Sequence, residues 1–410
     1  MPNVVRLVRW PLALAVLGAV ACSSGPSASI PAPSSHAQVS PSTMSAEASA
    51  SPSDLGGEAG GIEASPSPVP AAQVVKSYAV LVDLFAGRGT YTIALVDGDA
   101  QIVAHAQAAR RSDIADSIEL PYVSVSKSRV YYLDGDGAVR YLKADGTTGL
   151  VTSISGSGKV HATFAVSPDD SRIAVALLDY SARPVRLTLY VEDLGHSHHA
   201  VIFTSTSRYV WPVAWHAGQL VVAYLGPNAV PFKSKEILYS SRDLARYPYG
   251  PNPYGGINFH VISPVTAERS AIISGGGASG LLSKSGTAVV QGDAAGWHGE
   301  WIPWNSPHDY GTFSAAGSLS PDGSMIAACC EQPAGQGQLV IWSPNDQSRI
   351  LQATTTSGDW AGWLDNSHLV TGFYQSSDGT PSVVDLTSGA VTPVAAHGIV
   401  VAIFPSDLEA

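Results

Sequence analysis

Two stretches of this chain are nearly the same phrase, FAVSPDDSRIAVAL at residues 164–177 and GSLSPDGSMIAACC at residues 317–330. In each, a short apolar segment leads into Ser-Pro-Asp and one further Asp or Gly, and an apolar run follows. Pro at the second position of a type I turn, followed by Asp and Gly, is typical of tight turns between strands. Both stretches therefore predict a strand, a four-residue turn and a second strand.

The same hairpin pattern recurs from residue 78 onward. The last apolar residues before the successive turns are Leu84, Val125, Val166, Val213, Leu282, Leu319 and Gly362 or Trp363. From Val125 their spacing runs 41, 47, 69, 37 and 43 residues. A period of roughly 40–45 residues with four short strands in each unit indicates a β-propeller, because one such sheet cannot bury both faces alone.

We therefore predict an all-β fold, a β-propeller over residues 73–410 with seven four-stranded blades; six or eight blades are the alternatives. One apolar strand, GIVVAIF at 398–404, is left over after the seventh unit. We expect it to close the ring by pairing with the strands at 78–106.

The turn sequences resemble the WD40-like repeats of TolB-type propellers, whose hairpins carry Ser-Pro-Asp-Gly before an Ile-Ala run. The matching residues are Ser167 to Asp170 with Ile173-Ala174, and Ser320 to Gly323 with Ile326-Ala327. The Ser-Pro-Asp turn sequence itself occurs in two of the seven predicted units. It implies the fold rather than an activity, because propellers of this kind include binding modules and enzymes.

Residues 1–21 predict a signal peptide. Arg6 and Arg9 precede an apolar run that is shorter than the roughly 20 residues needed to span a bilayer, and small residues follow. The stretch resembles a bacterial lipoprotein signal, which implies that Cys22 is lipidated and anchors the chain to the extracytoplasmic face of the cell membrane. Ala19 stands where that family usually has leucine, so ordinary secretion is the alternative.

Residues 22–72 follow the predicted cleavage site and consist almost entirely of Ser, Pro, Ala and Gly. Such a composition cannot bury enough apolar surface to offset the entropy of ordering. We predict a disordered spacer between the lipidated cysteine and the propeller.

The formal net charge is −11, and removal of residues 1–21 with their two arginines gives −11 − 2 = −13. An acidic chain without a basic stripe argues against nucleic acid as a partner. Apart from Cys22, the cysteines are the adjacent Cys329 and Cys330. Neighbouring strand residues point to opposite faces, so we expect two small buried side chains; whether they pair stays open.

Aromatic side chains gather in WHGEWIPWNSPHDY, residues 297–310. Amphipathic rings near a propeller channel suit sugars and protein interfaces. The ligand-binding candidates of this stretch are Trp297, Trp301, Trp304, His308 and Tyr310. Trp211 and Trp360, beside the inner hairpins, are further candidates. For Trp215 and Trp363 we expect packing between blades, because wedges of this kind recur at one blade position.

The step of 69 residues between Val213 and Leu282 contains an irregular segment, residues 226–258. Long loops in compact domains are usually functional or disordered. This one carries a local basic cluster and, among prolines, the ligand-binding candidates Tyr247, Tyr249 and Tyr254. We expect it to lie over one face of the ring; a tolerated surface insertion is the alternative.

Other motifs give no site. The segment GSGK at 156–159 lacks the first glycine and the final Ser or Thr of a phosphate loop, and DGDG at 134–137 lacks the remaining ligands of a calcium loop. The histidines of GHSHHA at 195–200 are expected in a solvated loop rather than a metal site. Catalytic residues, if present, would converge in the central funnel from several blades: His161, His216, Asp293, Glu300, His308 and Asp359.

Together these features favour a membrane-anchored extracytoplasmic binding module, expected as a monomer without a cofactor or metal, for a protein or glycan partner of the cell envelope. The alternative is a propeller enzyme, either a polysaccharide hydrolase or lyase or a quinone-type dehydrogenase, with an active site in the funnel. A purely structural envelope protein is a third reading.

Overall fold

The computed structural model describes residues 76–114, 117–118, 120–225, 231, 258–274, 282–293, 296–304, 315–329, 337–344, 349–355, 360–372 and 381–410. All of them belong to the unit formed by residues 72–410. Their regular elements are 26 β-strands, and none of the described residues forms a helix that could cross a membrane. The predicted all-β class is confirmed.

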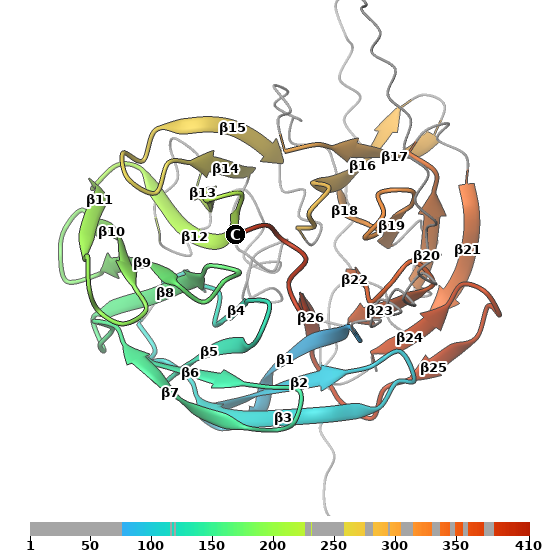
Figure 1. Ribbon diagram of the computed structural model, residues 1–410, viewed down its shortest axis with the longest axis horizontal. Helices are drawn as coiled ribbons and strands as arrows, with labels where there is room; N and C mark the ends of the chain where they lie inside the picture. The colour runs from blue at the N-terminus through green and yellow to red at the C-terminus, as the bar shows by residue number, and fades with distance from the viewer. Residues whose placement is uncertain are drawn as a thin grey trace, which may run out of the picture. The chain divides into compact units, whose positions relative to one another are not determined.

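The strands form antiparallel sheets that are arranged as the blades of a β-propeller around a common centre (Figure 1). The first blade has the strand order β26-β1-β2-β3, with β1 at Tyr78–Gly87, β2 at Thr90–Val96, β3 at Ile102–Ala109 and β26 at Ile399–Phe404. The second contains β4 (Val123–Val125), β5 (Val130–Asp134), β6 (Ala138–Leu142) and β7 (Thr148–Ser153).

The third blade contains β8 (Val160–Val166), β9 (Arg172–Asp179), β10 (Arg186–Asp193) and β11 (Ala200–Ser205). The fourth contains β12 (Tyr209–His216), β13 (Gln219–Leu225), β14 (Asn258–Ile262) and β15 (Arg269–Ser274).

A wider sheet comes next, in the order β17-β16-β18-β19-β20-β21. Its strands are β16 (Thr287–Asp293), β17 (Gly296–Ile302), β18 (Ala315–Leu319), β19 (Ile326–Cys329), β20 (Gly337–Trp342) and β21 (Arg349–Thr355). The last blade contains β22 (Trp360–Trp363), β23 (His368–Gly372), β24 (Ser382–Asp385) and β25 (Val391–Pro393).

The described residues thus form six blades, and the predicted count of seven is wrong. The expected fifth and sixth units share the six-stranded sheet, because β18 pairs with β19 on one edge and with β16 on the other. The strand expected before residue 284 is reduced among the described residues to a single bridge between Ser283 and Gly286. Among the described residues the hairpin of β16 and β17 has no innermost strand of its own, and β16 pairs instead with β18 of the next unit.

Ring closure follows the prediction. The strand β26 pairs antiparallel with β1, from Tyr78 opposite Phe404 to Val82 opposite Ile399. The innermost strand of the first blade therefore comes from a part of the chain that begins 290 residues after the end of β3.

The hydrophobic core lies between adjacent blades, and strand alternation decides which neighbour each side chain meets. On β9, Ile173 and Val175 join a cluster with the first and second blades, whereas Ala174 and Ala176 join a cluster with the fourth. Successive strand residues point to opposite faces, so one blade contributes to two separate cores. The alanines leave room on the second face for the bulky Trp215 of the fourth blade.

Candidate functional site

The innermost strands end at one face of the ring, where β4, β8, β12, β18 and β22 each turn into the next strand and β26 continues into residues 405–410; we call it the inner-turn face. A cavity of about 130 Å³ lies on the ring axis behind this face. Its wall includes Val125, Pro168, Leu319 and Leu364 from different blades. Among the described residues that line it, Asp407 is the only titratable side chain.

Two predicted ligand residues, Trp301 and Trp304, lie together at this face. The indole N–H of Trp301 donates to the carbonyl oxygen of Ser285 at 2.8 Å, and that of Trp304 donates to the carbonyls of Ser283 and Lys284, each at 3.0 Å. Both indoles are thus fixed on the turn that links the Ser283–Gly286 bridge. Trp301 remains 45% exposed, which presents a rigid aromatic surface to solvent.

A histidine completes the aromatic surface. The ring of His216, at the end of β12, stacks on Trp304 with a centroid separation of 4.0 Å and an interplanar angle of 12°. Burial lowers the pKa of His216 below its ordinary value, against a smaller opposing effect of Glu409. The imidazole is therefore neutral near pH 7, and its Nδ1 accepts a hydrogen bond from the backbone N–H of Glu409 at 3.4 Å. We name Trp301, Trp304 and His216 the aromatic ledge.

The segment after β26 lies across the inner-turn face, and Figure 1 shows this end of the chain at the centre of the ring beside β12. The N–H of Ser406 donates to the carbonyl of Ser126 at 2.9 Å, and the N–H of Ala217 donates to the carbonyl of Glu409 at 3.1 Å. The N–H of Lys284 donates to a carboxylate oxygen of Asp407 at 3.2 Å. Residues 406–410, which we call the tail, thereby connect the turns of three different blades.

The Asp407 carboxyl is exposed to solvent, yet it stands in the concave mouth of the cavity among the surrounding strands. The surrounding strands displace part of the water that would hydrate the carboxylate, and this desolvation raises the pKa of Asp407 above its ordinary value. The bond from the Lys284 N–H opposes the shift only in part. Leu408, beside it, is only 6% exposed and lines the same cavity.

The remaining predicted ligand residues are placed as follows. Trp211 is fully buried in the core between the third and fourth blades. Trp297 lies on β17, opposite Gly292, and Trp360 begins β22, opposite Gly372. Outside the described residues lie Cys22, Tyr247, Tyr249, Tyr254, His308 and Tyr310.

The predicted funnel residues are not brought together as far as they are described. His161, at the start of β8, is 3% exposed; its Nε2 lies 3.2 Å from the carbonyl of Ser112, and its ring packs edge-on against Tyr180. His216 lies instead at the end of its strand, on the inner-turn face. Asp293 and Glu300 lie on β16 and β17, and Asp359 is outside the described residues.

Two of the histidines between β10 and β11 pair with carboxylates at the end of β10. His199 lies 2.9 Å from Glu192, and His198 lies 2.6 Å from Asp193. His196 contacts Thr152 of the second blade at 2.8 Å. Within the part of the chain that the structure describes, no set of three or more His, Cys, Asp or Glu side chains is grouped so as to hold a metal ion.

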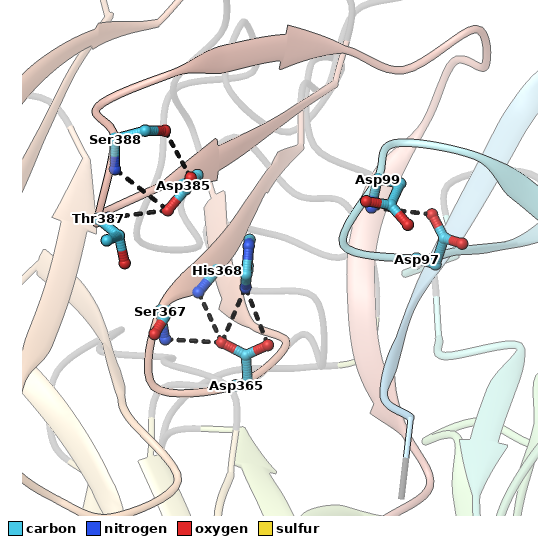
Figure 2. Close-up of polar contacts among 8 residues, drawn as sticks. All are labelled: Asp97, Asp99, Asp365, Ser367, His368, Asp385, Thr387 and Ser388. Atoms are coloured by element: carbon cyan, nitrogen blue, oxygen red, sulfur yellow. Dashed lines mark hydrogen bonds and ion pairs between the residues drawn. The ribbon is translucent and has the colours of Figure 1, made fainter. Parts of the chain in front are cut away.

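Several aspartates of the first and last blades bond to backbone N–H groups of their own turns (Figure 2). Asp365 accepts from the N–H groups of Ser367 and His368, and Asp385 accepts from Thr387 and Ser388. Burial alone would raise the pKa of Asp97, but its bonds with Lys76 and two backbone N–H groups outweigh this and leave the pKa lowered. These carboxylates stabilise turns, as Asp side chains commonly do.

Sequence reasoning missed Asp407, Leu408 and Glu409 as part of the site. A signal for them existed, because a strand at 398–404 that closes the ring is innermost, and the residues after an innermost strand emerge at the inner-turn face. Nothing in the letters of the tail shows which turns it bonds.

No protein-family model matches the chain, and no curated protein matches it. Among solved structures the chain is similar to TolB from Acinetobacter baumannii, with 12% identity and a TM-score of 0.38 over 80% of this chain and 65% of that one. It is also similar to an oligogalacturonate lyase in complex with manganese, with 11% identity and a TM-score of 0.34 over 75% of this chain and 71% of that one.

A third likeness is to the Dos1 propeller, with 12% identity and a TM-score of 0.40 over 77% of this chain and 83% of that one. The chain spans 65% of the length of the TolB chain that it matches. Similarities at this level concern the fold and assign no activity.

Proposed function

We propose that this protein is an extracytoplasmic binding module that takes a protein or glycan partner of the cell envelope at the aromatic ledge. The observation that carries the proposal is the exposed face of Trp301 beside the Trp304–His216 stack. The indole N–H groups of Trp301 and Trp304 already donate to backbone carbonyls, so these rings offer apolar faces that lose little conformational entropy on binding.

The position of the ledge supports the same proposal. Trp304 bonds the carbonyl of Ser283, which lines the axial cavity, so the ledge adjoins this cavity; sites built on strands and their turns hold their contacts with little reorganisation. Aromatic anchors of this kind are enriched at interface hot spots.

The anchoring part of the proposal rests on residues 1–22 of the sequence. Lipidation of Cys22 would hold the propeller at the outer face of the membrane through the spacer, as a monomer. A Cys22→Ser variant is then expected in the soluble extracytoplasmic fraction, and its retention in washed membranes would contradict the anchor.

The enzyme alternative requires acids and histidines from several blades around one substrate. The described wall of the cavity contributes only Asp407, and His308 and Asp359 are outside the described residues. That alternative therefore stays a prediction, and no contact described above favours it over binding.

The test is a thermal-shift screen of the protein against glycans and cell-wall fragments, followed by Trp301→Ala. A ligand at about 100 times its dissociation constant stabilises the native state by about 2.7 kcal/mol, a visible shift. We expect Trp301→Ala to abolish the shift without altering the unliganded melting temperature. Leu150→Ala, which truncates an apolar side chain on β7 that is 59% exposed, is the matched control.

A shift that survives Trp301→Ala would place the ligand elsewhere and sink the proposal for the ledge. Where no glycan shifts the protein, cross-linking from a photoreactive residue at position 301 in intact envelopes tests the protein partner. No cross-link from that position would count against the partner as well.

A further inference from the structure

The tail occupies the mouth of the cavity directly beside the aromatic ledge. Glu409 bonds His216, which stacks on Trp304, and Asp407 bonds Lys284, whose carbonyl accepts from the same indole. Any ligand that covers the ledge and extends toward the axis meets Asp407, Leu408 and Glu409 first.

The seat of the tail is small. It consists of one buried apolar side chain, Leu408, and isolated hydrogen bonds rather than a strand ladder, since the pairing of β26 with β1 ends at Phe404. Three of these bonds are 3.1–3.4 Å long, at the long end of the usual range.

Ordering five residues costs backbone entropy of the same order as the gain from burying one leucine and forming a few partly exposed hydrogen bonds. By contrast, β26 itself is held by a continuous ladder and by Ile399, Val401 and Phe404 in the inter-blade core. Because the entropy cost and the binding gain of the tail nearly cancel, the tail can detach from the ring, whereas β26 cannot.

We infer that residues 406–410 are a detachable plug. The plug covers the mouth of the cavity of its own chain, and a ligand of the aromatic ledge must displace it. This inference rests on the proposed function for what the plug regulates, but the plug itself can be tested without any ligand. Release of the tail frees Nδ1 of His216 and the N–H groups of Ala217 and Lys284, so the polar groups of the mouth become available to the incoming molecule.

The test uses Leu408→Asp in the full chain, with Leu150→Asp as the matched control because Leu150 is 59% exposed on the outer strand β7. Glu409→Pro is a second variant; it removes the N–H that bonds His216 together with the Glu409 carboxylate, and it keeps the carbonyl that accepts from Ala217. Hydrogen exchange is followed at the turns that hold Ala217 and Lys284. A fluorescein-labelled peptide FPSDLEA, residues 404–410, is added in trans.

We expect both tail variants to exchange faster at these turns only, with a melting temperature close to that of the parent. The peptide should bind Leu408→Asp, with its vacated mouth, and bind neither the parent nor Leu150→Asp. Faster exchange throughout the inner strands, or exchange at these turns that is unchanged in both tail variants, would show a fixed structural element and overturn the plug.

Once a ledge ligand is in hand, the same variants test the regulation. A plug seated about nine-tenths of the time weakens apparent affinity about tenfold, so Leu408→Asp should bind the ligand about tenfold more tightly. Unchanged affinity would show that plug and ligand do not compete. Failure of the ledge proposal is seen separately, because Trp301→Ala would then bind the ligand as well as the parent does.

Discussion

The two Ser-Pro-Asp turns follow β8 in the third blade and β18 in the six-stranded sheet. A comparison of the two separates the contacts made within such a turn from the contacts it makes with neighbouring blades. In the first turn Ser167 donates to Asp169 at 2.6 Å and accepts from the N–H of Arg172 at 2.9 Å. In the second, Ser320 donates to Asp322 at 2.7 Å and accepts from Met325 at 2.9 Å.

The fourth residue of each turn differs although its backbone does not. Asp170 and Gly323 both have positive φ, 62° and 75°, and the N–H of each bonds the carbonyl of the turn serine. The Asp170 carboxylate, however, reaches the second blade, where it accepts from Ser128 and, at 2.8 Å, from the hydroxyl of Tyr131. The second turn bonds forward instead, from the N–H of Asp322 to Asn366 of the last blade.

Both turns are followed by a tryptophan wedge in the next blade. The indole N–H of Trp215 donates to the carbonyl of Ala165, and that of Trp363 to the carbonyl of Ser318, in each case two residues before the turn serine. Both indoles are buried, which confirms the expected packing role. The comparison teaches that turn and wedge repeat as one unit, while charged contacts around them vary.

The largest effect is expected from loss of a wedge. Trp215→Ala and Trp363→Ala should each destabilise the protein by about 3–5 kcal/mol, because each leaves a cavity between two blades. Trp215→Ala should cost about 0.5–1 kcal/mol more, since Arg172 lies 4.6 Å over that ring, whereas the residue at the same position of the second turn, Met325, is uncharged and packs against the cluster that contains Trp363. Urea unfolding followed by circular dichroism measures both losses of stability. Equal losses would show that the cation–π contact contributes nothing measurable.

Loss of a turn serine should have the next largest effect. Ser320→Ala removes two hydrogen bonds at a buried hydroxyl, and Ser167→Ala removes at least three, including one from the N–H of Ser171; we expect each to cost about 1–3 kcal/mol. Ser324→Ala is the control, because its exposed hydroxyl also bonds Asp322, at 2.8 Å, and its loss should change stability by less than about 0.5 kcal/mol. The same unfolding experiment would contradict the assignment if all three variants cost the same.

The turn aspartates give the comparison a pH dependence. The bond from Ser167 lowers the pKa of Asp169; at Asp322, burial opposes but bonds from Ser320 and Ser324 prevail, and the pKa is again lowered. A lowered folded-state pKa stabilises the protein above the unfolded value of about 3.9 and loses that contribution as pH falls toward the folded value. Stability should therefore decline below about pH 4.

The Asn variants test this sign. Asp169→Asn and Asp322→Asn keep the acceptor oxygen but do not titrate, so each should narrow the difference between urea midpoints at pH 7 and pH 3. A difference as large as that of the parent in both variants would assign the acid sensitivity to other carboxylates.

The smallest effect is expected from exchange of the fourth turn residues. Asp170→Gly relieves a left-handed conformation that costs a non-glycine residue about 1 kcal/mol but loses two side-chain bonds of about 1 kcal/mol each. The net destabilisation should be about 1 kcal/mol or less. A Cβ at Gly323 would be in ordinary van der Waals contact with Ser285 at 3.6 Å, so Gly323→Asp should cost about 1 kcal/mol through its left-handed conformation alone.

The double variant Asp170→Gly with Tyr131→Phe sharpens the point. If the bond between the two side chains carries the difference between the turns, the combined loss will be smaller than the sum of the single losses. Strict additivity would show that this inter-blade bond contributes nothing measurable.

Much of the fold followed from local patterns. The hairpins around Ser167 and Ser320, the closing strand at 398–404 and the wedges Trp215 and Trp363 were all predicted, because turn chemistry and strand alternation act over a few residues. For the site, Trp301, Trp304 and His216 were candidates, but nothing in the sequence joined them into one surface.

By itself the sequence determined the class of fold, the blade rhythm and the chemistry of the turns, since each depends on contacts within one hairpin. Only the tertiary structure decided that β18 pairs on both edges and merges two expected blades, that Trp211 is core while Trp301 is surface, and that the tail crosses the mouth. These outcomes depend on contacts between residues far apart in the chain, such as Ala217 with Glu409, and no local spacing encodes them.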